Sequence, residues 1–182
     1  MATINDLPAG TWTVDASHSE LGFVARHLMV TKVRGSFKEF EGTVKVGDDI
    51  TDSSVTAVAQ LASIATGSAD RDAHLRSADF LDVDQFPSIT FRSTAVRVLG
   101  EDKLEVVGDL TIRGTTRQVV LATELSAEIR DPWGNAKRGV EATTRISRKD
   151  FGITWNLAIE TGGVVVGDHV DITLELELVR KG

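Results

Sequence analysis

The sequence contains no cysteine and no tyrosine, and only 5% of its residues are aromatic. The lack of cysteine excludes disulfides, thiolate nucleophiles and cysteine-ligated metals. The lack of tyrosine excludes phenol-based acid chemistry, and the few aromatic side chains leave little for stacking on nucleic-acid bases. The net charge of −7 also argues against a nucleic-acid partner, because phosphate binding needs a basic face.

Long apolar runs are missing as well. No segment approaches the roughly 18 consecutive apolar residues that a membrane-spanning helix needs, so we expect no membrane insertion. The first eight residues lack the basic region and the apolar core of a secretory signal peptide, which predicts a cytoplasmic protein. The chain has 182 residues and no linker or low-complexity segment, which predicts one domain over residues 1–182.

Motifs for catalysis and metal binding are also absent. The sequence has no Gly-x-Ser-x-Gly elbow and no phosphate-binding glycine loop. Its four histidines are far apart. Asp15 with His18, or His169 with its neighbouring aspartates, could supply metal ligands, but such residues near turns more often satisfy backbone groups. We therefore expect no enzyme, no metal and no cofactor.

Alternation of apolar and polar residues fills most of the sequence, and it is clearest at residues 104–112 and 172–178. About eight such strands, separated by turn residues, predict an all-β antiparallel barrel or a sandwich. Strands of more than ~10 residues favour the barrel. Small residues on the apolar faces suggest an incompletely filled lumen, although tapering barrels use them too; they are Ala57, Ala59, Gly108 and Ala142.

Two stretches allow more than one interpretation. Residues 26–29 fit either the end of a strand or a short helix. Residues 33–46 fit one long extended segment, which we expect to bend near Phe40–Gly42 because glycine tolerates bulge dihedrals.

A short helical insertion is predicted near residues 68–82. Ser68 fits an N-cap, and acidic residues follow it in the first turn, where the helix dipole favours them. Arg71 and His74 can share one face of this helix. These two side chains either contact a ligand head group at the barrel mouth or lock the helix to the barrel.

Three further side chains have two interpretations each. His27 lies on a mostly apolar face, which is more typical of a satisfied core residue than of a ligand contact. Trp133 and Trp155 could plug the barrel ends, and packing is the simpler interpretation for both.

Several blocks of the sequence form a recognisable combination. They are Trp12-Thr13-Val14-Asp15-x-x-His18-Ser19, Phe23-x-x-x-His27-Leu28, residues 33–42, residues 71–81, Phe86-Pro87-x-Ile89-x-Phe91, residues 108–116, residues 131–134 with Gly139, and residues 147–153. Each block alone is weak. Together, from about Trp12 to Val179, they resemble the YceI-like family of polyisoprenoid-binding proteins.

The resemblance implies an extended antiparallel barrel of the lipocalin-like type, with an apolar channel that holds an isoprenoid chain such as that of an isoprenoid quinone. It implies binding, transport or storage of this or another long apolar ligand rather than catalysis. Many relatives are periplasmic, whereas the N-terminus here groups the chain with cytoplasmic-looking members. A homodimer is left open, since dimers occur among relatives.

Apolar lumen residues are expected to hold the chain of the ligand, and a few polar residues at one end to select its head group. The head-group candidates are Arg71, His74 and His27. The full set of expected ligand contacts is Phe23, His27, Phe37, Phe40, Arg71, His74, Leu75, Phe80, Phe86, Phe91, Leu110, Ile112 and Trp155. Two alternatives are an enzyme acting on an apolar substrate in the same channel, with His74 or His27 as acid or base, and a filled barrel that serves as a partner-binding module.

Overall fold

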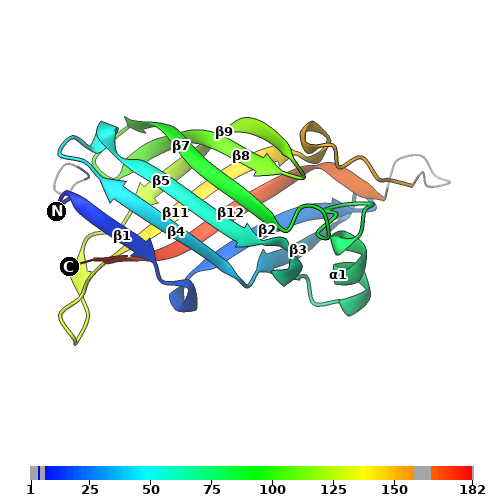
Figure 1. The fold of residues 1–182 in the computed structure, drawn as a ribbon, viewed down its shortest axis with the longest axis horizontal. Helices are drawn as coiled ribbons and strands as arrows, with labels where there is room; N and C mark the ends of the chain where they lie inside the picture. Colours follow the sequence, from blue (N-terminus) through cyan, green and yellow to red (C-terminus); the bar gives the residue numbers. More distant parts are fainter. Residues whose placement is uncertain (1–3, 5–6, 158–164, 182) are drawn as a thin grey trace.

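Most of the residues in the computed structural model belong to β-strands (Figure 1). The structure describes residues 4, 7–157 and 165–181. The strands are β1 (Gly10–Val14), β2 (Glu20–His27), β3 (Thr31–Phe37), β4 (Phe40–Val46), β5 (Ser54–Gln60), β6 (Ile64–Ala65), β7 (Ser88–Val98), β8 (Lys103–Ile112), β9 (Thr115–Leu125), β10 (Ile129–Arg130), β11 (Ala136–Ser147) and β12 (Val166–Arg180). The described helices are α1 (Ala69–Arg76) and the 3₁₀ turns η2 (Ala16–His18), η3 (Ile50–Asp52), η4 (Leu61–Ser63) and η5 (Arg148–Phe151). Among the described helices, none is both long enough and apolar enough to cross a membrane.

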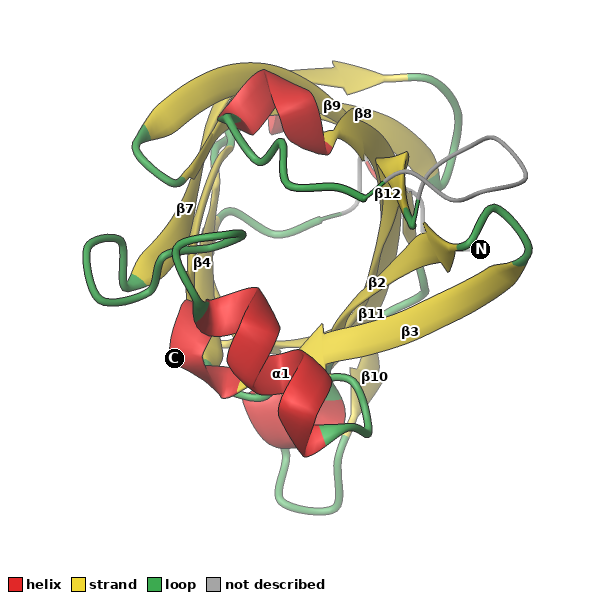
Figure 2. Ribbon diagram, turned by 90° about the vertical axis from the view of Figure 1, so that its right-hand side faces the viewer, coloured by secondary structure: helices red, strands yellow, loops and turns green. Residues whose placement is uncertain are grey.

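The sheet is antiparallel and closes on itself into a barrel (Figure 2). Strand β12 pairs with β11 along one edge and with β1 and then β2 along the other. Three barrel strands are interrupted and consist of the pairs β1/β2, β3/β4 and β5/β6. With β7, β8, β9, β11 and β12 they make an eight-stranded barrel, so the predicted fold class is confirmed.

The interruptions occur where side chains capture backbone groups that would otherwise join the ladder. In η2, the carboxylate of Asp15 accepts a hydrogen bond from the amide of Ser17 at 3.0 Å. Between β3 and β4, the amide of Glu39 donates to Ser63 Oγ at 3.0 Å, and Ser63 Oγ donates to the carbonyl of Gln60 at 2.6 Å. These contacts lie where β1 gives way to β2, β3 to β4 and β5 to β6.

Of the two stretches that allow more than one interpretation, one differs from the expectation and the other is decided by the structure. The bend expected near Phe40–Gly42 lies earlier, at Lys38 and Glu39, and β4 begins at Phe40. Gly42 is not in the left-handed region; a Cβ there would lie only 2.9 Å from Cγ2 of Val14. At residues 26–29 the strand interpretation is correct, because β2 continues to His27 and a turn follows.

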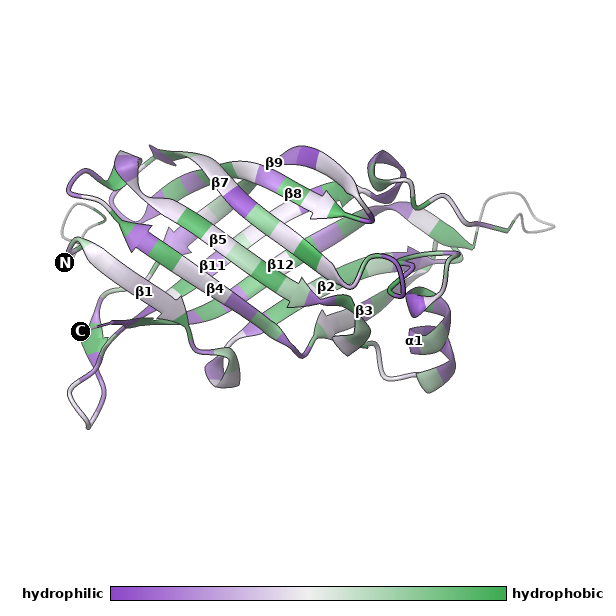
Figure 3. Cartoon of the chain, viewed as in Figure 1, coloured by the Kyte–Doolittle hydropathy of each residue, from purple (hydrophilic) through white to green (hydrophobic). Residues whose placement is uncertain are grey.

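The inner face of the barrel carries the apolar phase of the alternation, which Figure 3 shows as bands along the strands. Glycine on this face makes room for aromatic rings. A Cβ on Gly108 would lie 2.5 Å from Phe91 Cζ and 2.6 Å from the carbonyl oxygen of Arg92. A Cβ on Gly35 would lie 2.3 Å from Phe23 Cζ. Two of the large lumen side chains therefore depend on a glycine in the neighbouring strand.

The two barrel ends are covered differently. At the end where the chain begins, Ile4 is almost fully buried against β7 and β8, and its amide donates to the carbonyl of Glu101 at 2.7 Å. Helix α1 lies at the rim of the opposite end (Figure 2). Ser68 accepts a hydrogen bond from the amide of Arg71 at 3.3 Å, so the predicted N-cap is confirmed.

We expect Gly108→Ala to lower the free energy of unfolding by about 1–3 kcal/mol, as overpacking does in cores. The added methyl group would meet a backbone carbonyl as well as a ring, so a side-chain rotation alone cannot relieve the clash. Urea unfolding followed by circular dichroism measures the change. Gly100→Ala is the control, because its Cβ would meet only Lys103 Cβ at 4.0 Å. Equal stability of the two variants would contradict the packing described for Phe91.

Candidate ligand-binding lumen

The barrel lumen contains a row of three cavities. The termini cavity, of about 110 Å³, lies at the end where the chain begins; the central cavity has about 150 Å³; the helix cavity, of about 140 Å³, lies next to α1. Neighbouring cavities share walls. Val44, Leu121 and Leu174 line both the termini and the central cavity, and Phe23 and Ile172 line both the central and the helix cavity. The row therefore follows the barrel from end to end.

The walls of these cavities are almost wholly apolar. Valine, leucine, isoleucine and phenylalanine supply most of the lining, and the small residues Ala57 and Ala59 widen the central cavity. Ala142 lines the termini cavity, whereas Phe91 fills the space above Gly108. Cavities of this kind stay dry and take up apolar molecules.

Four phenylalanines form one side of the central cavity: Phe23, Phe37, Phe40 and Phe91. The rings of Phe23 and Phe37 pack at a centroid distance of 5.6 Å. Leu110 and Ile112 of β8 line the same cavity, and Ile112 also reaches the helix cavity. The sequence-predicted residues thus gather in the central part of the lumen, and their contact with a ligand stays a prediction.

Helix α1 and the turns after it contribute Leu75 and Phe80 to the helix cavity. Phe86, also predicted as a ligand contact, lies against Gly114 and is not among the residues that line the three cavities. The ring of Trp155 packs edge-on against His74, with the ring centroids 4.7 Å apart, and in a tilted arrangement against Phe80, with the centroids 5.2 Å apart. Its packing role is confirmed, and it lines none of the three cavities.

The polar side chains of α1 lock the insertion in place. Arg71 donates from Nε to Thr66 Oγ1 and from Nη2 to the Thr66 carbonyl, both at 2.7 Å. Asp72 accepts from the amide of Thr66 at 2.9 Å. His74 Nε2 lies 2.9 Å from Asp79 Oδ2. Of the two roles that the sequence leaves open for Arg71 and His74, locking is the one that the geometry supports.

Two side chains lie elsewhere than expected. His27 is exposed at the end of β2 and lines none of the three cavities, so the core interpretation is wrong. His27 still pairs with Val166 and Thr31, but it is the last residue of β2 and lies beyond Ala25, which lines the helix cavity. Trp133 is 83% exposed in the turn before β11, so it neither packs nor plugs a barrel end.

Two arginines of the β11 region point inward. Arg148 is 4% exposed and donates to the carbonyls of Ile153 at 2.8 Å, Gly167 at 2.9 Å and Trp155 at 3.0 Å. Burial lowers the pKa of its guanidinium below the usual value, and the nearby carboxylate of Asp168 opposes this shift. Arg148 thus joins residues 153–155 to Gly167 of β12 at the α1 end of the barrel.

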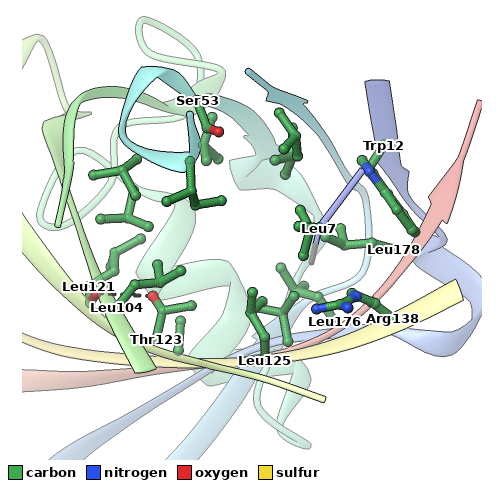
Figure 4. A pocket seen from close by; sticks show the side chains of 18 of the residues that line it. Leu7, Trp12, Ser53, Leu104, Leu121, Thr123, Leu125, Arg138, Leu176 and Leu178 are labelled. Atoms are coloured by element: carbon green, nitrogen blue, oxygen red, sulfur yellow. Dashed lines mark hydrogen bonds between the residues drawn. The ribbon is translucent and has the colours of Figure 1, made fainter. Parts of the chain in front are cut away.

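Arg138 lies at the other end of the lumen, on the wall of the termini cavity, and is only 2% exposed. Trp12 lines the same cavity at 1% exposure, and its indole Nε1 has no hydrogen-bond acceptor among the described residues. Figure 4 shows both side chains on the same side of this cavity, next to Leu178. A buried donor without an acceptor costs about 1–3 kcal/mol, so a ligand that brings an acceptor would be favoured here.

The residues of the termini cavity escaped the sequence-based prediction, which concentrated on the central part and the insertion. Arg138 stands in phase with the inward residues Ala136, Val140 and Ala142. A charged residue on the apolar phase of a strand was the signal that could have identified it. Trp12 carries no such signal, because a tryptophan on an apolar face usually only packs.

One of the two groups considered as metal ligands does come together. The ligand atoms of Asp15, His18 and Glu177 lie within 4.8 Å of one another. However, Lys137 Nζ lies 2.6 Å from Glu177 Oε1 and 3.9 Å from Asp131 Oδ2, so an ammonium already supplies positive charge here. The Ser17 hydroxyl and His18 lower the pKa of Asp15 to about 2, and Asp15 in turn raises the pKa of His18.

This cluster is best explained as an ion-pair network. Hydrogen bonding to Glu177 raises the pKa of Lys137 and keeps it charged. The network joins the β1–η2 corner to β11 and β12 on the outside of the barrel. The second group considered as metal ligands consists of His169 and its neighbouring aspartates. There Arg145 Nε donates to Asp171 Oδ1 at 2.6 Å, and Lys149 Nζ lies 3.3 Å from Asp168 Oδ1.

Solved structures share this barrel. Burkholderia cenocepacia BcnA superposes with a TM-score of 0.79 at 24% sequence identity, over 90% of this chain and 98% of the other. A polyisoprenoid-binding domain from Saccharophagus degradans, implicated in plant cell wall breakdown, gives a TM-score of 0.68 at 17% identity, over 93% of this chain and 98% of the other. At these identities the likeness establishes the fold.

Sequence comparison establishes the family. A UPF0312 protein of Staphylococcus aureus (strain N315) is 42% identical over 170 residues, which cover 91% of this chain and 95% of that protein. Residues 12–178 match the YceI-like domain, a span that begins at Trp12 in the termini cavity and ends at Leu178 on its wall. The chain therefore belongs to the YceI-like domain family.

Proposed function

We propose that this protein binds a long isoprenoid lipid of the quinone type inside the barrel and transports or stores it. The observation that carries the proposal is the row of three apolar cavities along the lumen. A row of cavities suits a long, narrow ligand better than a compact one. The polyisoprenoid-binding domain with the same fold supports the choice of ligand class.

The energetics fit a ligand that is mostly hydrocarbon. Each methylene group moved out of water contributes about 0.8 kcal/mol, so a chain of several isoprene units outweighs the entropic cost of association. Contacts of this kind are not selective, because any apolar chain of similar width makes them. Selectivity has to come from polar groups on the lumen wall.

The polar groups that face the lumen favour a head group with hydrogen-bond acceptors at the termini cavity. Trp12 Nε1 is a buried donor without an acceptor among the described residues, and quinone carbonyls are acceptors. The chain of the ligand would then lie along the central and helix cavities. The earlier head-group candidates at the other end are less suitable, because Arg71 is bonded to Thr66 and His74 to Asp79.

Protein purified without detergent and extracted with organic solvent should yield an isoprenoid lipid in near-stoichiometric amount by mass spectrometry. Delipidated protein should take up ubiquinone. The quenching of tryptophan fluorescence measures this uptake. The proposal fails if no lipid is extracted and ubiquinone does not bind.

A larger side chain in the central cavity should block the ligand. Ala57→Phe places a ring among the phenylalanines that line this cavity and should weaken ubiquinone binding at least tenfold, about 1.4 kcal/mol. Ala122→Phe is the matched control, since Ala122 is exposed on β9, and should bind like the native chain. Thermal unfolding verifies that both variants are folded; equal binding by two folded variants would place the ligand outside the lumen.

Removal of the indole N–H should change selectivity without emptying the lumen. Trp12→Phe should weaken ubiquinone binding by roughly 3–10-fold, which corresponds to one hydrogen bond of about 1 kcal/mol. Binding of squalene, an isoprenoid hydrocarbon without acceptors, should stay the same. Trp155→Phe serves as control because Trp155 does not line the described cavities. An equal loss for both ligands would assign Trp12 a packing role only.

A further inference from the structure

The turn between β2 and β3 exposes three consecutive apolar side chains. Leu28 is 41% exposed, Met29 60% and Val30 76%. Leu157, at 57% exposure, belongs to the segment that bonds to this turn, because Leu28 N donates to the carbonyl of Val165 at 2.8 Å and Val165 N donates to that of Leu157 at 3.0 Å. Apolar side chains this exposed and this close together mark an interaction surface.

The backbone of the turn holds these side chains outward. Leu28 and Met29 have positive φ values of 52° and 62°, in the left-handed region that usually takes asparagine, aspartate or glycine in such hairpins. The amide of Val30 donates to the carbonyl of His27 at 3.1 Å and closes the turn. Large apolar residues therefore occupy strained positions where polar ones would fit better, and packing among the described residues does not explain them.

The charge around the turn is basic, although the whole chain carries −7. Residues 24–34 contain Arg26, Lys32 and Arg34 and no acidic residue. Arg26 and Lys32 are exposed and lie directly opposite each other in the hairpin. The acids nearest to the turn in the neighbouring strand are Asp168, which follows Gly167 beside Arg26, and Asp171, opposite Val24. Each faces a basic side chain, because Lys149 lies 3.3 Å from Asp168 and Arg145 lies 2.6 Å from Asp171.

The opposite end of the barrel provides the contrast. It also exposes apolar side chains, with Leu99 at 63% and Ile129 at 62%. There the nearby charges are mixed, because Glu101, Asp102 and Glu128 accompany Arg97, Lys103 and Arg130. Among the described residues, the β2–β3 turn is where strong exposure of consecutive apolar side chains and basic charge coincide.

We propose that residues 26–32, the hairpin tip, dock onto a lipid bilayer that contains anionic headgroups. Leu28, Met29 and Val30 enter the apolar edge of the headgroup layer, and Arg26 and Lys32 contact the phosphates. A convex tip of this kind enters a fluid layer, whereas a protein partner would need a matching pocket. The tip and α1 lie at the same end of the barrel in both Figure 1 and Figure 2.

Docking in this way would bring one end of the lumen to the membrane. Ala25, two residues before the end of β2, lines the helix cavity, and so does Val166, which pairs with His27. The proposal concerns the outside of the barrel and does not depend on what the lumen holds, so the two proposals can fail separately.

The test is flotation of the full chain with vesicles of phosphatidylcholine alone or of phosphatidylcholine with phosphatidylglycerol. The native chain should float with the anionic vesicles, less with the neutral ones, and less when salt screens the charges. Met29→Asp combined with Val30→Asp should reduce flotation at least tenfold. Aspartate tolerates the left-handed conformation at position 29, so this variant should fold, which circular dichroism verifies.

Two further variants make the result specific. Arg26→Ser with Lys32→Ser should remove the preference for anionic vesicles. Leu99→Asp with Ile129→Asp changes the same number of exposed apolar residues at the opposite end and should float like the native chain. The proposal is overturned if the native chain does not float with anionic vesicles, or if the tip variant and the opposite-end variant float equally.

Discussion

Strand β12 is bonded to β11 along one edge and to β1 and β2 along the other, and this double pairing closes the barrel. In a closed barrel most backbone groups of the strands are satisfied within the wall. The shortest of the seams here joins β9 and β11 over Val140–Thr143. The lumen therefore needs no polar side chains to satisfy the backbone. A long, almost wholly apolar interior follows from closure, and so does its suitability for a hydrocarbon ligand.

The filling of this interior is incomplete in a regular way. Gly35 and Gly108 allow the rings of Phe23 and Phe91 to lie inside, while the small residues Ala57 and Ala59 on β5, between β4 and β7, leave space beside these rings. A cavity of about 150 Å³ destabilises a folded protein by something on the order of 3 kcal/mol, at the cost per volume known from engineered cavities. Because small domains are stable by only about 5–15 kcal/mol, an apolar ligand that fills the lumen contributes substantially to folding.

The sequence was sufficient to predict the barrel, its number of strands and the helical insertion, because strict alternation and a capped helix are local signals. It was insufficient where the outcome depends on contacts between distant residues. The bend at Lys38 and Glu39 depends on Ser63, which lies more than twenty residues away. The burial of Arg138 depends on the closure of the barrel around it, and the exposure of His27 depends on its place at the end of β2, beyond the cavities. The central lining was predictable from aromatic residues in recognisable blocks, whereas the polar end was not.

The two ends of the lumen differ in chemistry. One holds the buried donors of Trp12 and Arg138 behind the N-terminal segment, and the other lies beside α1 and an exposed, basic hairpin tip. In the complex that we propose, this polarity gives the lipid a direction, with the head group beside Trp12. A crystal structure of protein purified without detergent tests this claim most directly. The account predicts continuous density through all three cavities, broadest beside Trp12 and Arg138; density that is absent, or broadest beside α1, would contradict it.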